Sequence, residues 1–313
     1  MIPTRSELQH RTNRLAFGAF VEREWAIGVL QVGIPELVAS LIEDGHFPDV
    51  PVHWLRGIRP GRFVADPRTI VWQGQTWLLH ELFLPGRARG VIAAVRYLDG
   101  QFLDHRIVID EPGQHLAYPT VVVDGDRLLC LPDAPGSTGV PVYFGSTPTS
   151  WTYAGHLQGV PPLTDPTLAH LDEGWLLLGL ARDPGGAGKQ LRVFTADDVL
   201  GRWRELRVTS DGPAECRRPG GPLVSLADGR VVRPAQDGRD QYGRGIVFQE
   251  ITIDGRNFHE RPIAEVGPSE DWPFGDGFHT LTGTADLSVV DACRFRVTPV
   301  AGPRRLLYRV RAQ

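Results

Sequence analysis

Five stretches of the sequence share one pattern, and this repeat constrains the fold more than any other feature. Each begins with a polar or aromatic residue and continues with a short β-prone run, a turn rich in Gly or Asp, and a second apolar run. The stretches are ADPRTIVWQGQTWLLHELF, AYPTVVVDGDRLLCLPDA, TDPTLAHLDEGWLLLGLAR, RPGGPLVSLADGRVVRPAQD and GFHTLTGTADLSVVDACRF. They open at Asp66, Tyr118, Asp165, about Gly220 and Phe278, so the steps are 52, 47, about 55 and about 58 residues. A period near fifty with a hairpin in each unit predicts the blades of a β-propeller.

The rest of the chain fits the same interpretation. The 36 glycines and 26 prolines leave little room for long helices, and short apolar runs bounded by turns are typical of an all-β fold. We predict one domain, residues 1–313, that forms a five-bladed β-propeller of four-stranded antiparallel blades. Residues 50–313 supply the blades, and residues 1–50 supply a closing strand (24–32) and a short helix (34–45) that ends at Gly45. The runs 24–32 and 305–312 would share the last blade and close the ring.

Charge and cysteine content exclude several classes of function. The net charge of −4 indicates no nucleic-acid or membrane partner. The first twenty residues lack the apolar segment of a signal peptide, and no run of eighteen apolar residues occurs. The three cysteines are far apart and lack metal-binding spacing. We therefore expect a reduced, cytoplasmic protein without a cofactor that acts on a small molecule; its oligomeric state stays open.

Propeller geometry brings many polar residues together on one face of the ring. The first strand of each blade lines the central axis, and the second strand runs back antiparallel to it. The starts of first strands and the ends of second strands therefore meet on the same face, here called the near face. Strand starts and ends give Asp66, Tyr118, Asp165, Arg218, His279, Glu81, Asp133, Arg182, Gln236 and Asp237, and adjoining loops add His115, Tyr242, Arg244 and Trp272. Such convergent polar groups predict a ligand site.

Asp66 and Asp165 are the first candidates for catalysis. An Asp-Pro dipeptide also starts turns and strands without a catalytic role. However, carboxylates that crowd at an axis raise one another's pKa, which suits general acid–base chemistry. Tyr118 could tune one of them through a hydrogen bond, and Glu81 or Asp133 could supply a further carboxylate or bind a nearby arginine.

The other candidates have more than one interpretation each. Arg218 and Arg244 could clamp an anionic group of a substrate, or form ion pairs with Asp237 or Glu81. His279 could be an acid–base group, a ligand to an axial ion such as calcium, or a satisfied buried polar group. We expect no catalytic metal. Tyr242 and Trp272 could stack on a sugar, or could simply pack.

The motifs FVADP, HELF, AYPTVV, LPDA, RPGGPL and QDGRDQYGR resemble two related groups of propellers. The broader group is the five-bladed glycoside hydrolases of family 43 and their relatives in family 32. The closer match, over about residues 50–250, is the N-terminal propeller of glucosamine inositolphosphorylceramide transferases. The transferase activity belongs to a separate domain, for which this chain has no room.

The family-43 resemblance implies three carboxylates: a base on the first blade, a pKa-tuning acid on the second and a proton donor on the third. The matching positions here are Asp66, Tyr118 and Asp165. The resemblance therefore implies a glycoside hydrolase-like enzyme. Tyr118 at the second position makes a lyase, isomerase or cyclase of natural-product metabolism the second hypothesis. A non-catalytic propeller that binds a glycan or a protein is the third.

Overall fold

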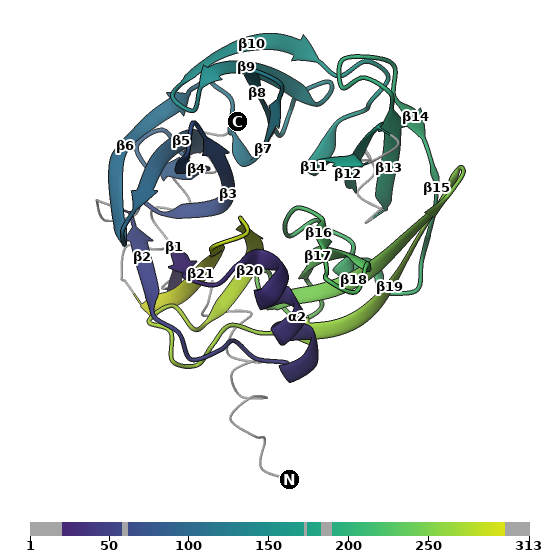
Figure 1. Ribbon diagram of the computed structural model, residues 1–313. Helices are drawn as coiled ribbons and strands as arrows, with labels where there is room; N and C mark the ends of the chain where they lie inside the picture. The colour runs from purple at the N-terminus through teal and green to yellow at the C-terminus, as the bar shows by residue number, and fades with distance from the viewer. Residues whose placement is uncertain (1–20, 58–61, 172–173, 183–189, 298–313) are drawn as a thin grey trace.

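Five sheets stand in a ring around a central axis, as Figure 1 shows. The computed structural model describes residues 21–57, 62–171, 174–182 and 190–297. The five-bladed β-propeller predicted from the repeat is confirmed. Within the described ranges, no helix is long and apolar enough to cross a membrane. The predicted closing run 305–312 lies outside the described residues.

The first three blades follow one another along the chain, each listed here from the axis outward. Blade 1 contains β3 (Val64–Trp72), β4 (Gln75–Leu84), β5 (Arg89–Leu98) and β6 (Gln101–Ile109). Blade 2 contains β7 (Ala117–Asp124), β8 (Arg127–Asp133), β9 (Pro141–Thr147) and β10 (Ser150–His156). Blade 3 contains β11 (Leu163–Leu171), β12 (Gly174–Ala181), β13 (Leu191–Ala196) and β14 (Arg204–Glu205).

Blade 4 departs from the simple repeat because it has a fifth strand. Its strands are β16 (Val224–Ser225), β17 (Val231–Asp237), β18 (Gly245–Asp254), β19 (Asn257–Val266) and β15 (Arg207–Ser210). β15 arrives from the outer edge of blade 3 and pairs in parallel with β19. A short 3₁₀ helix, η1 (Ala214–Cys216), then leads the chain back toward the axis.

Blade 5 closes the ring by combining the two ends of the described chain. It contains β20 (Gly277–Gly283), β21 (Ser288–Val297), β1 (Val21–Leu30) and β2 (Val52–Arg56). β1 pairs with β21 along its whole length, from Val21 opposite Val297 to Leu30 opposite Ser288. The predicted closing strand is therefore present, and the last blade is held together by segments far apart in sequence.

The predicted helix is also present as α2 (Ile34–Asp44). Gly45 ends it in the left-handed conformation (φ 75°), and its N–H donates to the carbonyl of Leu41. The buried side chains of Ile34, Leu37, Val38 and Leu41 pack against blades 4 and 5. This amphipathic face explains why the helix covers that part of the ring in Figure 1.

Hydrophobic clusters fill each of the five interfaces between neighbouring blades. Successive side chains of a strand point to opposite faces of its sheet. In β4, Leu78 therefore packs toward blade 5 and Leu79 toward blade 2. In β12, Leu177 packs toward blade 2, whereas its neighbours Leu176 and Leu178 pack toward blade 4. Burial on both faces explains why the second strands have continuous apolar sequences such as WLLLGL.

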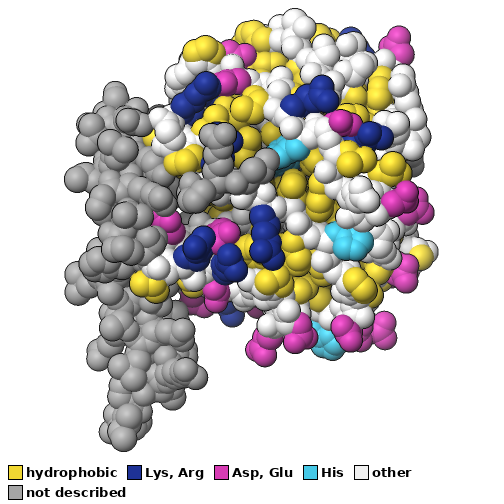
Figure 2. Space-filling view, turned by 90° about the vertical axis from the view of Figure 1, so that its left-hand side faces the viewer, with side chains coloured by type: hydrophobic (Ala, Val, Ile, Leu, Met, Phe, Trp, Pro, Cys, Tyr) yellow, Lys and Arg dark blue, Asp and Glu magenta, His cyan; other side chains and the backbone are white. Residues whose placement is uncertain are grey.

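Charged side chains at the outer edge of blade 1 pair with one another. Figure 2 looks at the side of the ring on which β6 lies and shows basic and acidic side chains interspersed. On this edge Arg96 pairs with Asp104 at 2.9 Å, and both side chains are partly exposed. Such exposed pairs contribute little to stability, so the blade interfaces carry most of it.

We expect Leu177→Ala to lower the free energy of unfolding by about 2–5 kcal/mol, because it opens a cavity in the interface between blades 2 and 3. Urea denaturation measures this. The matched control is Leu98→Ala, since Leu98 is 48% exposed, and it should change stability by no more than about 0.5 kcal/mol. Equal effects of the two substitutions would contradict the assignment of the core to the blade interfaces.

Candidate active site

The same β-bulge opens the inner strand of four blades. In each, two inner-strand residues lie opposite one residue of the second strand. The two residues are Asp66–Pro67, Tyr118–Pro119, Asp165–Pro166 and His279–Thr280. A bulge of this kind redirects side chains, and bulges are common beside active sites. The repeat therefore explains why these residues occupy equivalent positions at the near face.

Three of the four opening residues have a strained backbone. The φ angles of Asp66, Tyr118 and Asp165 are 53°, 43° and 51°. Positive φ is costly for residues other than glycine, and most of all for a bulky residue such as tyrosine. Strain of this kind persists where the surroundings enforce it and is concentrated at functional sites. Starting a strand requires no such strain.

Asp66 belongs to a buried cluster with His279 and Asp291. The Nε2 atom of His279 lies 3.3 Å from Asp66 Oδ1, and its Nδ1 atom lies 2.8 Å from Asp291 Oδ1. Asp291 also accepts the backbone N–H groups of Asp66, His279 and Thr280 at 2.9, 3.1 and 2.9 Å. One carboxylate therefore fixes both the strained backbone of Asp66 and the orientation of the imidazole.

His279 is held as an imidazolium. Burial opposes its charge, but the carboxylates of Asp291 and Asp66 outweigh burial and raise the pKa of His279 to about 10. Burial likewise opposes ionisation of Asp291, yet His279 and the backbone N–H donors lower the pKa of that carboxyl. At neutral pH the cluster consists of one imidazolium between two acceptors.

Asp165 lies in a second buried cluster. Arg218 donates to it from Nε at 2.5 Å and from Nη2 at 3.1 Å, and the amide of Gln236 donates at 2.7 Å. The backbone N–H of Asp165 donates to Asp133 at 3.2 Å. Asp133 thus holds the strained backbone of Asp165 as Asp291 holds that of Asp66.

Asp133 is also bonded to Arg182. Burial, and then the charge of Asp165, raise the pKa of Asp133 to about 7, although the two arginines oppose this. In this cluster Arg218 therefore pairs with Asp165 and Arg182 with Asp133, while the Nη1 atom of Arg182 has no hydrogen-bond partner among the described residues.

Glu81 differs from the other acids in that one of its carboxyl oxygens, Oε1, receives no hydrogen bond from the described residues. Glu81 is 5% exposed, and its Oε1 atom has no hydrogen-bond partner among the described residues. Burial, followed by the charge of Asp66, raises the pKa of Glu81 well above its usual range. A Cβ atom on Gly90 would lie 2.3 Å from Oε1, so glycine at this position makes room for the carboxyl group. Burial and the missing hydrogen bond thus favour the protonated form of Glu81.

His115 is a polar neighbour of that oxygen. Its Nε2 atom lies 3.6 Å from Glu81 Oε1, while its Nδ1 atom accepts the backbone N–H of Gly90 at 2.9 Å. Because Nδ1 accepts, the hydrogen of the neutral ring is on Nε2 and faces Glu81. Burial lowers the pKa of His115, which favours this neutral form.

Tyr118 and Arg68 lie at the centre of the ring. The Tyr118 hydroxyl lies 3.0 Å from Thr167 Oγ1, and the guanidinium of Arg68 lies 4.6 Å from the tyrosine ring centroid. Arg68 also donates to the hydroxyls of Thr120 and Thr167, so it joins blade 1 to blades 2 and 3. Burial raises the pKa of Tyr118 to about 12 although Arg68 opposes the shift, so the phenol stays neutral.

Other predicted site residues lie at different distances from these clusters. Tyr242 contacts the axial group, since its ring centroid lies 4.9 Å from that of His279 and 5.3 Å from the guanidinium of Arg218. Asp237 faces away from Asp165: it binds Arg239 and Arg244 at 2.8 and 2.9 Å. Successive side chains of β17 point to opposite faces of the sheet, so Gln236 faces Asp165 and Asp237 faces the other way.

Arg244 and Trp272 are not brought to the axis. Arg244 is part of the surface cluster with Asp237. Trp272 packs on Phe47, Trp54 and Phe278 at centroid distances of 4.4, 5.6 and 6.4 Å, in the core beside α2. An aromatic residue in a loop carries no sequence signal that separates these two environments.

Asp291 was not among the residues selected from the sequence, although it holds the Asp66 cluster together. It lies in the second strand of the fifth hairpin, whose turn is irregular, so the end of that strand was not assigned. The signal was an acid within the otherwise uncharged run LSVVDAC (Leu287–Cys293). Arg68, two residues after Asp66, was also missed, because only the openings of first strands, the ends of second strands and the adjoining loops were considered.

The atoms of Asp66, His279 and Asp291 lie within 4.8 Å of one another, which is close enough to surround a metal ion. Calcium takes six to eight oxygen ligands, whereas this group offers two carboxylates and one imidazole. Both ring nitrogens of His279 face carboxylate oxygens and carry hydrogens, so neither offers a lone pair. These residues do not fit a calcium ion, and the imidazolium supplies the positive charge instead.

Comparison with known proteins agrees with the geometry. Residues 55–267 match the family model described as "Glucosamine inositolphosphorylceramide transferase 1, N-terminal". The proteins of that name from the japonica and indica subspecies of Oryza sativa are each 28% identical to the chain over 215 residues. The match covers 65% of this chain and 28% of each relative, so the chain spans little more than a quarter of their length.

Solved structures share the fold at low sequence identity. A family-43 β-xylosidase/α-arabinofuranosidase from a compost microbial metagenome has a TM-score of 0.54 and 12% identity, over 78% of this chain and 93% of that one. A β-1,2-mannobiose phosphorylase from Listeria innocua has a TM-score of 0.53 and 13% identity, over 81% and 95%. A GH43_1 enzyme from Xanthomonas citri has a TM-score of 0.52 and 14% identity, over 75% and 88%.

The raised pKa of His279 predicts how stability depends on pH. The folded state keeps this proton up to about pH 10, whereas the unfolded state releases it near 6.5, so the folded state binds more protons between these values. The contribution is complete below about pH 6.5 and is lost as the pH rises toward 10. We expect the free energy of unfolding of the wild type, relative to His279→Gln, to fall across this range in urea titrations. A difference that is constant from pH 6.5 to 10 would show that His279 is neutral.

Proposed function

The chain belongs to the family defined by the N-terminal region of glucosamine inositolphosphorylceramide transferase 1, and we propose that its axial site carries out acid–base chemistry on a glycoside or a similar polyol. In this proposal Glu81 donates a proton to the leaving oxygen, and Asp66 acts on the opposite side of the reacting carbon as base or nucleophile. Such paired carboxyl groups are how glycosidases divide the two roles.

The observation that carries the proposal is the state of Glu81. A general acid must hold its proton at working pH and must have a free direction in which to donate it. Burial and the charge of Asp66 keep Glu81 protonated, and its Oε1 atom has no hydrogen-bond partner among the described residues. A buried polar atom in this state costs stability, and a bound substrate oxygen would satisfy it.

Asp66 is suited to the second role because its position is fixed from two sides. Asp291 holds its backbone N–H, and the imidazolium of His279 pairs with its side chain. Positions held this closely reduce the reorganisation needed to reach a transition state.

Asp165 and Tyr118 then orient the substrate. Asp165 already accepts three hydrogen bonds, from Arg218 and Gln236. Its best role is therefore as a fixed acceptor for a substrate hydroxyl, with Arg218 beside it as a donor. The neutral Tyr118 hydroxyl can donate or accept at the centre of the ring.

The names of similar proteins support this substrate class. The propellers compared above include a β-xylosidase/α-arabinofuranosidase and a β-1,2-mannobiose phosphorylase, and both names refer to chemistry at glycosidic bonds. The rice relatives are named as transferases, and this chain corresponds to a quarter of their length. We therefore propose glycosidic-bond chemistry in general and leave hydrolysis, transfer, and non-hydrolytic elimination, isomerisation or cyclisation to be separated by product analysis.

Glu81→Gln and Asp66→Asn should each lower kcat on alkyl glycosides by at least about a hundredfold, since each removes one half of the acid–base pair. The melting temperature should stay within a few degrees of the wild type. The control is Asp228→Asn in the exposed turn of blade 4, which should keep full activity. Unfolding of both site variants would instead assign these acids a structural role.

The leaving group separates the two roles. The leaving group of a 2,4-dinitrophenyl glycoside is dinitrophenolate, which departs without protonation. Glu81→Gln should therefore retain most of the wild-type activity on this substrate, whereas Asp66→Asn should not. In the wild type, kcat/KM on alkyl glycosides should fall on the alkaline side as Glu81 loses its proton, and this limb should be absent with the dinitrophenyl substrate. Equal losses on both substrates for Glu81→Gln would exclude it as the proton donor.

A further inference from the structure

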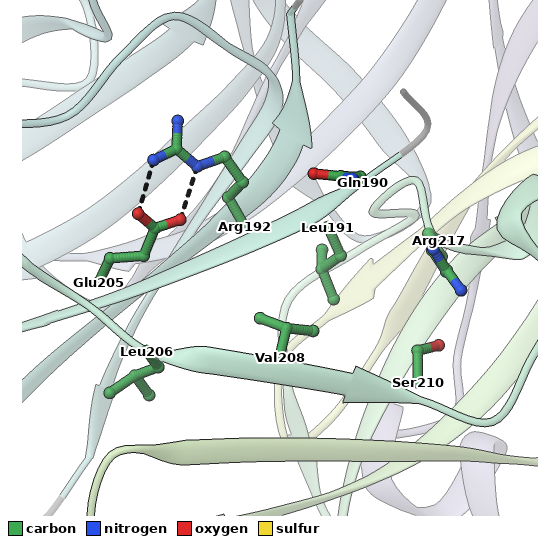
Figure 3. A pocket seen from close by; sticks show the side chains of 8 residues that line it. All are labelled: Gln190, Leu191, Arg192, Glu205, Leu206, Val208, Ser210 and Arg217. Carbon is green, nitrogen blue, oxygen red and sulfur yellow. Dashed lines mark hydrogen bonds and ion pairs between the residues drawn. The ribbon is translucent and has the colours of Figure 1, made fainter. Parts of the chain in front are cut away.

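Three cavities of the described structure lie outside the axial clusters, and their linings differ in chemistry. The one between blades 3 and 4 measures about 320 Å³ (Figure 3). Two of its charged groups, Arg192 and Glu205, pair with each other at 2.6 Å. The third is Arg217, whose buried Nε atom has no hydrogen-bond partner among the described residues, and most of the remaining lining residues are aliphatic. None of the residues that line it is aromatic. It therefore offers a ligand one guanidinium group but no flat ring face.

The other two cavities lie on either side of the loop that leads from blade 1 to blade 2. Asp110, Pro112, Gly113 and His115 line a cavity of about 660 Å³ on one side. Glu111 and Gln114 line a cavity of about 280 Å³ on the other. His115 connects the larger cavity to Glu81, since its Nε2 atom lies 3.6 Å from Oε1. The smaller cavity, here called the blade-2 pocket, therefore lies on the near face but farther from the axis.

Two tyrosines form one wall of the blade-2 pocket. Tyr143 in β9 and Tyr153 in β10 lie directly opposite each other in the sheet, with ring centroids 5.4 Å apart. Tyr153 is 49% exposed, whereas Tyr143 is buried behind it. Tyrosine combines a flat apolar face with a polar end, and an exposed one in a concave site is characteristic of ligand contact.

A β-bulge brings His156 to the same wall. Residues three apart in a strand normally point to opposite faces. Between Tyr153 and His156 the register shifts at Gly155, whose φ is 105°, so that the partners of these two residues are Tyr143 and Pro141. Since Tyr143 and Pro141 are two apart, they share a face, and so do Tyr153 and His156. The bulge therefore assembles an aromatic ring and an imidazole on one side.

The polar groups of the pocket are already held in place by one another. His156 Nε2 lies 2.9 Å from the Ser137 hydroxyl, and its Nδ1 lies 3.4 Å from the Tyr153 hydroxyl. Tyr143 donates to Glu111 Oε1 at 3.2 Å. Burial, and then the neighbouring Glu111, raise the pKa of Tyr143, so this hydroxyl stays a donor. Groups fixed before a ligand arrives lose less entropy when they bind it.

The residues that line the pocket define the class of ligand. They include a carboxylate, an amide, hydroxyls, an imidazole and an exposed aromatic ring, and no arginine or lysine is among them. This composition does not attract an anion and offers many partners for hydroxyl groups. A volume of about 280 Å³ is at the lower limit for ligand pockets, roughly 300–1,000 Å³, and leaves room for a single small ring.

We propose that the blade-2 pocket is an accessory binding site for one neutral sugar ring, which stacks on Tyr153 and hydrogen-bonds to Glu111, Gln114, Ser137 and His156. The site is separate from the axial clusters and binds whether or not the axis is catalytic. Where a substrate has more than one ring, the pocket lies on the near face beyond His115 and can hold a distal ring.

Fluorine NMR on protein labelled with 3-fluorotyrosine tests the proposal, because the tyrosines report on different places. Tyr143 and Tyr153 line the blade-2 pocket, Tyr118 and Tyr242 lie at the axial clusters, and Tyr97 is bonded to His53 away from both. The probes are glucose, xylose, mannose and cellobiose, and single Tyr→Phe variants assign the resonances. We expect saturable shifts of the Tyr143 and Tyr153 signals and none of the Tyr97 signal.

Substitutions then locate the bound sugar. Tyr153→Ala should weaken the sugar affinity reported by Tyr143 at least about tenfold, or about 1.4 kcal/mol. Glu111→Gln should also weaken it without altering an exposed ring. The control Val123→Ala, on an exposed apolar residue of the same blade, should leave it unchanged.

The proposal is overturned if none of the four sugars shifts Tyr143 and Tyr153, or if Tyr153→Ala leaves the affinity intact. Shifts at Tyr118 and Tyr242 alone would support the axial site and refute the accessory one. Shifts at Tyr143 and Tyr153 in a protein that turns over no glycoside would support the accessory site and refute the proposed chemistry at the axis.

Discussion

Closure of the ring is the constraint on which the rest of the structure depends. A blade buries its apolar faces only against its two neighbours, so an open ring would leave two faces in water. β1 provides closure by pairing with β21 over its entire length and by contributing Ile27 and Val29 to the interface with blade 1. The hydrogen bond from the Asp66 backbone to Asp291 crosses the same interface between blades 5 and 1. Stability and the geometry of the candidate site therefore depend on one junction.

A second constraint acts at the axis, where many ionisable groups share a small buried volume. The protein meets it by giving most charges a partner: Asp66 and Asp291 share His279, Asp165 binds Arg218, and Asp133 binds Arg182. Glu81 is left without a cationic partner at hydrogen-bonding distance and is neutralised by its proton instead. Paired acids and an unpaired one have different chemistry, although all lie at the same face of the ring.

Much of this arrangement can be derived from the sequence because a propeller is periodic. The hairpin repeat predicts the number of blades, and the alternation of faces explains why β4 and β12 are apolar throughout. Strand direction alone places Asp66, Glu81, Asp133 and Asp165 on one face. The hairpin repeat alone does not predict which of two adjacent residues at the end of a strand turns inward, and for this reason Asp237 was selected with Gln236. Periodicity also gives no information about the environment of loop residues. Trp272 was therefore assigned to the site, although it packs against the core beside α2.

The interface between blades 1 and 5 also determines the order of events during synthesis of the chain. Asp66 and Asp291 are separated by 225 residues, so the ribosome completes blades 1 to 4 before the acceptor for the Asp66 backbone N–H exists. Until then the first blade has a solvated face, and Asp66 has neither His279 nor Asp291 beside it. Contacts of such sequence separation form late and slowly. The groups that fix Asp66 are therefore in place only after blade 5 has been synthesised.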